Sequence, residues 1–215
     1  MKKQAIQEVI EELKTLYPDA ICSLCYQKDY ELLFAVRLSA QCTDARVNLV
    51  TPALYARFPT LESFAEADAE EVGRYIHSCG FYNSKSRDIV ACAQMLLRDY
   101  GGRVPGTMEA LISLPGLGRK TANLILGDIY KQPAYVCDTH CIRITGRLGI
   151  TDGSQDPLSV EGQLRKALPP KESGDFCHRL VLFGRDTCTA RNPKCAECPL
   201  RRLCKTGKNT KGCPK

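Results

Sequence analysis

Two side chains with the capacity for chemistry, Lys120 and Asp138, frame one distinctive stretch of the sequence. Lys120 follows the glycine turn at residues 114–118, Leu-Pro-Gly-Leu-Gly. A proline without an amide proton and the flexible glycines, Gly116 and Gly118, stop a helix here. The amides of such a turn and of the next helix's first turn can bind a phosphate without reading base sequence. The pattern indicates chemistry on a nucleic acid; the simpler alternative is an ordinary helical hairpin with a surface lysine.

A second group of chemically capable residues lies near the end of the chain. Four cysteines there form a C-x6-C-x2-C-x5-C pattern in a segment too short to have a core of its own, which a metal centre would organise. Zinc sites usually show paired C-x2-C knuckles, and only one such pair occurs here. Four closely spaced thiolates also suit a cubane iron–sulfur cluster, so the spacing favours a cluster and leaves zinc open. The cysteines are Cys188, Cys195, Cys198 and Cys204, and Cys213 is expected to be a free thiol.

Positive charge is concentrated around these cysteines. The whole chain has 30 bases and 24 acids, a net charge of +6. From Arg191 onward there are eight bases and one acid, which is 8 − 1 = +7. Arg191 and Lys194 lie in the loop between the first two cysteines, where a metal centre would hold bases rigidly against phosphates. The alternative is a solvated basic terminus.

The elements that must position these residues are helical. Apolar residues recur at helical spacing along most of the 215 residues, and no convincing strand alternation appears. This predicts an all-α fold of about ten helices with short connections. The basic start is not followed by an apolar run, so we expect no signal peptide, no transmembrane segment and a cytoplasmic protein with reduced cysteines. Besides the hairpin, helices are predicted at about 2–17, 29–38, 45–58, 61–65, 68–76, 85–100, 139–148, 157–168 and 172–187. The helix at 139–148 has Asp138 at its N-cap, and Arg143 and Arg147 lie on a different face from its apolar residues.

Two polar or aromatic turns interrupt the helices. Gln41 and Asp44 lie between two apolar helices, either as a capped junction or as a loop presented to a ligand. Phe81 opens the segment Phe-Tyr-Asn-Ser-Lys, which ends at Lys85. The residues alone favour a staple that closes the next helix on the core. The alternative is an aromatic wedge that enters a base stack.

Together these parts resemble the endonuclease III family of DNA glycosylases. The matching motifs span nearly the whole chain in the family's order, and their joint occurrence by chance is implausible. Phe81 stands where the family carries an aliphatic wedge, and Cys137 and Cys141 stand where small or apolar residues are usual, which is expected to make the site sensitive to oxidation. The matching segments are residues 38–44, 80–85, 114–123 and 136–140, and the four terminal cysteines.

The resemblance implies a two-domain helix–hairpin–helix glycosylase fold with a C-terminal [4Fe–4S] cluster loop. One domain is a helical barrel at residues 22–132, with the hairpin at about 107–131. The other combines residues 1–21 with 133–215, where the four cysteines bind the cluster. Lys120 and Asp138 are then expected to face each other across a cleft that receives a flipped pyrimidine.

The same resemblance implies the chemistry and the partner. Removing a base leaves positive charge on the sugar, which Asp138 stabilises while Lys120 attacks C1′ as a neutral amine. A helix N-terminus and a closed cleft both disfavour the ammonium form of such a lysine. The resulting Schiff base acidifies the C2′ proton, and β-elimination breaks the strand on the 3′ side. Gln41 fills the gap left by the flipped base, Phe81 wedges the duplex, and the amides of Gly116 and Gly118 hold the backbone.

The expected substrate is double-stranded DNA that contains oxidised pyrimidines or abasic sites, bound by a monomer associated with the nucleoid. Two alternatives remain at this stage. A mismatch adenine glycosylase of the same superfamily would lack the lysine at the position of Lys120 and carry a further recognition domain. A non-catalytic iron–sulfur DNA-binding or redox-sensing protein would have no use for Lys120 paired with Asp138.

Overall fold

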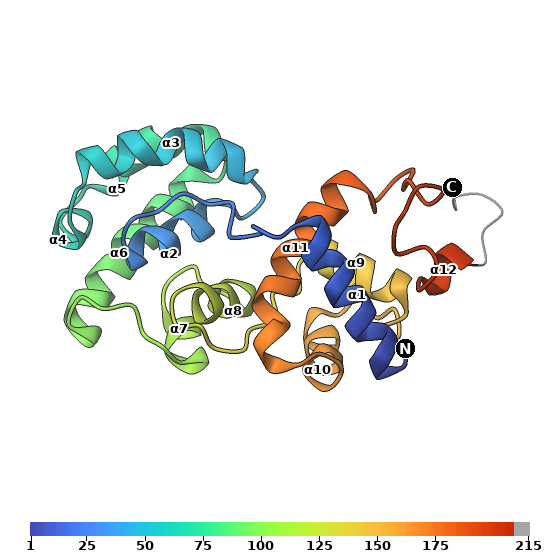
Figure 1. Ribbon diagram of the computed structural model, residues 1–215. Helices are drawn as coiled ribbons and strands as arrows, with labels where there is room; N and C mark the ends of the chain where they lie inside the picture. Colours follow the sequence, from blue (N-terminus) through green and yellow to red (C-terminus); the bar gives the residue numbers. More distant parts are fainter. Residues whose placement is uncertain (209–215) are drawn as a thin grey trace. The chain divides into compact units, whose positions relative to one another are not determined.

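The computed structural model describes residues 1–208, and all regular elements in that range are helices (Figure 1). The predicted all-α fold is confirmed. The chain forms two compact units. Cys22–Tyr130 is called the hairpin unit here; Met1–Ile21 together with the chain from Lys131 onward is called the cysteine unit. No helix in the described range is long and apolar enough to span a membrane. Cys213 lies outside the described residues.

The hairpin unit is built around α2, Asp29–Leu38, which is apolar on nearly all sides. Leu32 and Phe34 are fully buried, as expected of a helix that other helices surround. Phe34 meets Phe64 edge to face with ring centroids 5.0 Å apart. The long helix α6, Tyr82–Tyr100, packs against α2, α4 and α5. The other helices are α3 (Asp44–Arg57), α4 (Leu61–Ala65), α5 (Ala69–Ile76), η1 (His77–Cys79), α7 (Met108–Ser113) and α8 (Arg119–Asp128).

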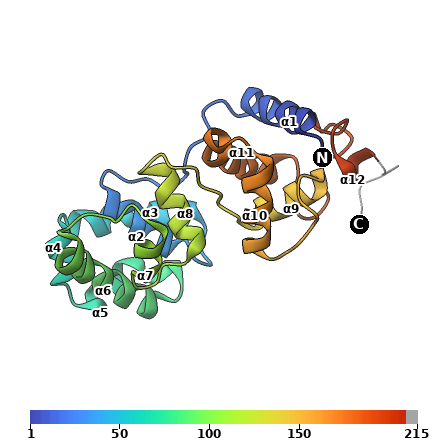
Figure 2. The same ribbon diagram turned by 90° about the horizontal axis from the view of Figure 1, so that it is seen from below.

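The cysteine unit joins the two ends of the chain. Helix α1, Lys3–Leu16, buries Ile6, Val9, Ile10 and Leu13, which recur at the spacing of one helix face. These residues share one apolar cluster with Phe176 and Leu180 of α11, and α1 lies beside α11 in both views (Figure 1, Figure 2). The other helices are α9 (Thr139–Leu148), α10 (Pro157–Ala167), η2 (Pro170–Glu172), α11 (Ser173–Asp186) and α12 (Lys205–Lys208).

The loop that carries the four cysteines is joined to the core of its unit. It consists of turns between the end of α11 and the start of α12. Leu200, within this loop, is fully buried in the same apolar cluster as Ile10 and Leu148. Leu200 thus holds the middle of the loop in the core, and Leu203 packs against the same cluster. The rest of the loop's course also depends on polar contacts and on the cysteines.

Candidate functional site

The turn between α7 and α8 requires glycine at position 116. Gly116 has φ +74°, and a Cβ there would lie 2.5 Å from Nε of Arg37 and 2.7 Å from Oδ2 of Asp88. These two side chains form an ion pair between α2 and α6, with Nη2 of Arg37 2.6 Å from Oδ2 of Asp88. The Leu117 amide donates to the Leu114 carbonyl at 3.2 Å and closes the turn. The predicted helix–hairpin–helix is therefore present and packs on an ion pair.

Helix α8 begins at a residue that has no side chain with which to cap it. The N-cap is Gly118, and a Cβ added there would meet nothing within 4 Å. Lys120 is the second residue of the helix, and its side chain is exposed. Ala122 and Ile125, further along α8, are buried and fix the helix in the unit. The hairpin thus holds an exposed amine beside a helix N-terminus that supplies no anion of its own.

Asp138 occupies the N-cap of α9, as the sequence predicted. Its carboxylate accepts a hydrogen bond from the Cys141 amide, with Oδ1 2.7 Å from the nitrogen. The residue is half-buried, and the Asp138 amide donates to the Val136 carbonyl at 3.0 Å. The capping bond leaves the carboxylate little rotational freedom.

The cysteines on either side of Asp138 belong to the core. Cys137 and Cys141 are buried, and Cys177 of α11 lies beside Cys141. Hydrogen bonding to Cys137 and Cys177, together with burial, raises the pKa of Cys141 well above its ordinary value. Since the thiolate is the reactive form, the raised pKa disfavours oxidation of Cys141, and the expected oxidation sensitivity of the site stays a prediction.

The two interrupting turns both contain a residue in the left-handed region. Gln41 has φ 54° and is exposed, while the junction is capped separately by Thr43, which accepts from the Arg46 amide. Phe81 has φ 48° and is 67% exposed, so its interpretation as a core staple is wrong. Helix α6 starts at Tyr82 instead of the predicted residue 85. The Tyr82 ring packs instead, with its centroid 4.4 Å from the centroid of the His77 ring.

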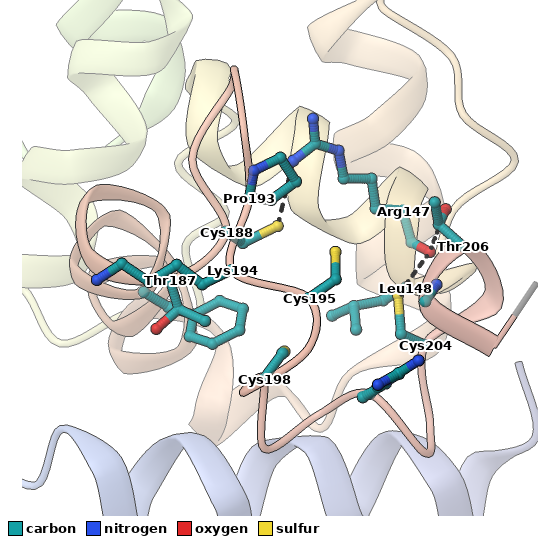
Figure 3. A pocket seen from close by; sticks show the side chains of 13 residues that line it. Arg147, Leu148, Thr187, Cys188, Pro193, Lys194, Cys195, Cys198, Cys204 and Thr206 are labelled. Atoms are coloured by element: carbon teal, nitrogen blue, oxygen red, sulfur yellow. Dashed lines mark hydrogen bonds between the residues drawn. The ribbon is translucent and has the colours of Figure 1, made fainter. Parts of the chain in front are cut away.

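The four terminal cysteines line one cavity. Figure 3 shows Cys188, Cys195, Cys198 and Cys204 around it, together with Arg147 and Leu148 of α9. A cubane cluster takes one thiolate at each of four corners. The donor set and its layout therefore fit a [4Fe–4S] cluster.

Two arginines of α9 fasten the start of this loop. Arg143 donates through Nη2 to the Cys188 carbonyl at 2.9 Å and to the Gly184 carbonyl at 3.3 Å. Arg147 donates through Nη1 to the Thr189 carbonyl at 2.8 Å and to Sγ of Cys188 at 3.4 Å. Neither arginine's contact with the loop was predicted from the sequence. Their spacing of four residues, on one face of the helix that follows Asp138, was the available signal.

The basic residues of the loop are exposed. The side chain of Arg191 is exposed, and the Arg191 carbonyl accepts a hydrogen bond from Oγ1 of Thr189 at 2.6 Å. Lys194 lies 3.5 Å from Oδ1 of Asp186, and both side chains are more than half exposed. An ion pair this open contributes little to stability, so Lys194 can exchange Asp186 for another anion.

The predicted site residues are divided between the two units. The cysteine unit brings its four thiols to one cavity and holds Asp138 on the helix that borders this cavity. The hairpin unit contains Gln41, Phe81, Gly116, Gly118 and Lys120, and the cysteine unit contains Asp138, Arg191 and Lys194.

Family models match two parts of the chain. Residues 34–170 match the HhH-GPD superfamily of base excision DNA repair proteins. Residues 188–204 match the iron–sulfur binding domain of endonuclease III. The second match begins and ends at the first and last of the four cysteines, and it decides for iron–sulfur over zinc.

Characterised relatives match over nearly the full length. The chain is 44% identical to endonuclease III of Synechocystis, over 94% of this chain and 93% of the relative. It is 38% identical to endonuclease III of Escherichia coli, over 95% and 96%. A solved structure titled as a trapped endonuclease III–DNA covalent intermediate superposes with a TM-score of 0.91 at 41% identity, covering 97% of this chain and 98% of the other.

Proposed function

The chain belongs to the endonuclease III family, and from that premise we propose that Lys120 and Asp138 are its catalytic residues. The protein is a base-excision repair enzyme, a DNA glycosylase with abasic-site lyase activity that carries a [4Fe–4S] cluster. Neither a mismatch adenine glycosylase nor a non-catalytic iron–sulfur protein is favoured by these relatives. The observation that carries the assignment is Lys120 itself, an exposed amine in the first turn after the hairpin.

In the proposed reaction, Nζ of Lys120 attacks C1′ of the damaged nucleotide as a neutral amine. The glycosidic bond breaks, and the base leaves with the bonding electrons and takes up a proton. Opening of the sugar ring then gives an imine between Nζ and C1′. Loss of the C2′ proton and departure of the 3′ phosphate break the strand, and water hydrolyses the imine to return the lysine. Because Lys120 is exposed in the free protein, its desolvation would come from the bound DNA.

We assign to Asp138 the stabilisation of the positive charge that develops on the sugar. Its Oδ1 atom is engaged by the Cys141 amide, which fixes the carboxylate, and we assign Oδ2 to the sugar. A carboxylate held in place before the reaction stabilises the transition state without reorganising. The same group can accept the proton that the attacking amine loses.

Six further positions are proposed to bind the DNA backbone or enter the duplex. Gln41 and Phe81 stand exposed on left-handed turns, which suits a gap-filling amide and a wedge. The amides of Gly116 and Gly118 are proposed to hold a phosphate near the lesion. Arg191 and Lys194 add positive charge from the cysteine loop. A surface that binds DNA agrees with the two related endonuclease III structures, which are complexes with DNA.

The cluster is proposed to bind through the thiolates of Cys188, Cys195, Cys198 and Cys204. Bonds from these four thiolates to iron would fix the course of a loop that Leu200 joins to the core. Arg143 and Arg147 position the first of these cysteines through its carbonyl and sulfur. We therefore assign these two arginines to the loop's attachment and not to DNA.

We propose that the substrates are oxidised pyrimidines and abasic sites in double-stranded DNA. The protein is proposed to act as a monomer in the cytoplasm, at the nucleoid. Duplexes that contain thymine glycol, dihydrouracil, an abasic site or an adenine mismatch separate these possibilities when base release and nicking are scored independently. Base release confined to the adenine mismatch would contradict the proposed substrate class.

Borohydride trapping tests the nucleophile. Reduction of the imine is expected to give a covalent protein–DNA adduct with an abasic or oxidised-pyrimidine duplex. Lys120→Gln should abolish the adduct and retain DNA binding, because only the nucleophile is removed. Lys131→Gln is the matched control, since it removes another exposed lysine close in sequence. Undiminished trapping by Lys120→Gln would refute the assignment.

A further inference from the structure

A lysine that the reaction does not use lies buried in the hairpin unit. Lys85, in the first turns of α6, is 1% exposed, although lysine is almost never fully buried unless it is paired. Its Nζ donates to the Leu38 carbonyl at 2.7 Å and to the Cys79 carbonyl at 2.9 Å. Burial lowers the pKa of Lys85. The cation is therefore kept inside by two backbone acceptors, at an electrostatic cost that calls for an explanation.

The two acceptors are both helix ends. Leu38 is the last residue of α2, and Cys79 is the last residue of η1. The final carbonyls of a helix have no partner within it, and they carry partial negative charge. One ammonium group thus joins the C-terminal ends of two helices whose last residues are 79 − 38 = 41 positions apart in the sequence.

Each of these helix ends leads directly into a turn with a left-handed residue. Gln41 follows Leu38 by three positions and has φ 54°. Phe81 follows Cys79 by two positions and has φ 48°. Left-handed angles are unfavourable for side chains other than glycine and persist only where the surroundings hold them. Lys85 supplies such a hold at the base of both turns.

A second polar contact joins α2 to α6, the helix that contains Lys85. Arg37, the neighbour of Leu38 in α2, donates to Asp88, which lies one turn beyond Lys85 in α6. This ion pair lies against Gly116 of the hairpin, where it fills the space that a Cβ would need. The end of α2 is consequently fixed to α6 at two adjacent points, and the turns at Gln41, Phe81 and Gly116 share one frame.

We propose that Lys85 is a positioning residue that sets the spacing between Gln41 and Phe81, so that the gap-filling amide and the wedge enter the duplex together. This rests on the proposed function, in which both side chains contact DNA. Lys85 itself is too deeply buried to touch DNA. A purely structural lysine would instead stabilise the fold and leave the action of the two turns on DNA unchanged.

A double-mutant cycle distinguishes these roles. Lys85→Met removes both hydrogen bonds and keeps the side chain's length. We expect its affinity for a duplex with a tetrahydrofuran abasic analogue to fall about tenfold, and its affinity for undamaged duplex to fall less than about twofold. In a Gln41→Ala, Phe81→Ala background, Lys85→Met should weaken lesion binding by less than about twofold. Equal losses in both backgrounds, or no loss in either, would overturn the inference.

A spectroscopic measurement gives an independent test. With 2-aminopurine beside the lesion, the wild-type protein should raise its fluorescence by unstacking it. Lys85→Met should reduce this change even at saturating protein, whereas a structural role alone would leave the saturated signal unchanged. Arg87→Met is the matched control, because it removes an exposed cation from the same helix. Its effect should be equal in both backgrounds.

The same set separates failure of the inference from failure of the proposed function. If the Gln41→Ala, Phe81→Ala protein prefers the lesion duplex as strongly as wild type, the two turns do not probe DNA and the proposed function of these residues fails. If that protein loses the preference and Lys85→Met keeps it, only the inference about Lys85 fails. Should Lys85→Met not fold, Lys85→Gln, which can still donate to one carbonyl, carries the same cycle.

Discussion

The N-termini of α8 and α9 hold the two proposed catalytic residues in opposite ways. Helix α9 begins at Asp138, whose own carboxylate accepts from the Cys141 amide at 2.7 Å. Helix α8 begins at Gly118, which supplies no acceptor, and Lys120 stands in its first turn. Both ends present amides and partial positive charge, which attract an anion.

The difference shows how one backbone feature serves two purposes. At α9 the anion is part of the protein, and capping orients the group that is proposed to stabilise the sugar. At α8 the place of the anion is left to a partner, and a DNA phosphate has the charge and size to occupy it. We propose that capping by Asp138 and the absence of a side chain at Gly118 both serve the reaction on DNA.

The largest effect is expected from neutralising the anion at α9. Asparagine caps a helix as well as aspartate does but carries no charge. Asp138→Asn should therefore slow base release by about 10²–10³-fold, because the developing positive charge loses its partner. The free energy of unfolding should change by less than about 0.5 kcal/mol. Single-turnover kinetics and chemical denaturation measure the two quantities.

Asp138→Ala completes this test, since it removes the cap as well as the charge. It should slow base release as much as Asp138→Asn does and also lower the free energy of unfolding by about 1 kcal/mol. A rate for Asp138→Asn close to wild type would show that the carboxylate acts as a cap and not in the reaction.

The N-cap at Asp138 and the cysteine spacing could be predicted because both are local. An aspartate before an apolar helical run signals an N-cap, and the C-x6-C-x2-C-x5-C pattern places four thiols on one short loop. The hairpin was equally visible, since a proline and two glycines leave a helix few options. In each case the residues that determine the feature lie close together in the sequence.

Other features could not be predicted because the partners are distant in the sequence. Lys85 was predicted only as the first residue of a helix, and the fold brings it to the carbonyls of Leu38 and Cys79. Phe81 looked like a staple because an aromatic residue before a helix usually packs, but its left-handed conformation turns it outward and Tyr82 packs instead. Arg143 was expected on a separate helix face, without its contact to Cys188.

An intermediate effect is expected from giving α8 its own anion. Gly118 has φ −117°, which any residue adopts, and open space around a Cβ, so Gly118→Asp should fit. The new carboxylate should cap α8, raise the free energy of unfolding by a few tenths of a kcal/mol, and repel a phosphate. Affinity for an abasic-analogue duplex should fall about tenfold, which corresponds to about 1.4 kcal/mol.

Gly118→Asn is the matched variant for this experiment, because it caps without charge. Its affinity should fall by only about threefold, or about 0.7 kcal/mol at 1.4 kcal/mol per tenfold. Equal binding by Gly118→Asp and the wild type would mean that no phosphate occupies the end of α8. The contrast between the two helix N-termini would then be structural only.

The smallest effect is expected where positive charge is carried by flexible side chains instead of fixed amides. Arg191 and Lys194 are exposed, and Lys194 is held only by an open ion pair with Asp186. Replacing both by alanine should weaken binding about threefold to tenfold and leave the free energy of unfolding within about 0.5 kcal/mol of wild type. Because each lost phosphate contact lowers the salt slope by about 0.9, the slope should fall by up to about 1.8.

Replacing Lys166 and Lys171, two exposed lysines of the same unit, by alanine removes equal charge and is the control. If both double variants shift the slope equally, the effect belongs to net charge, and the cysteine loop has no special place in DNA binding.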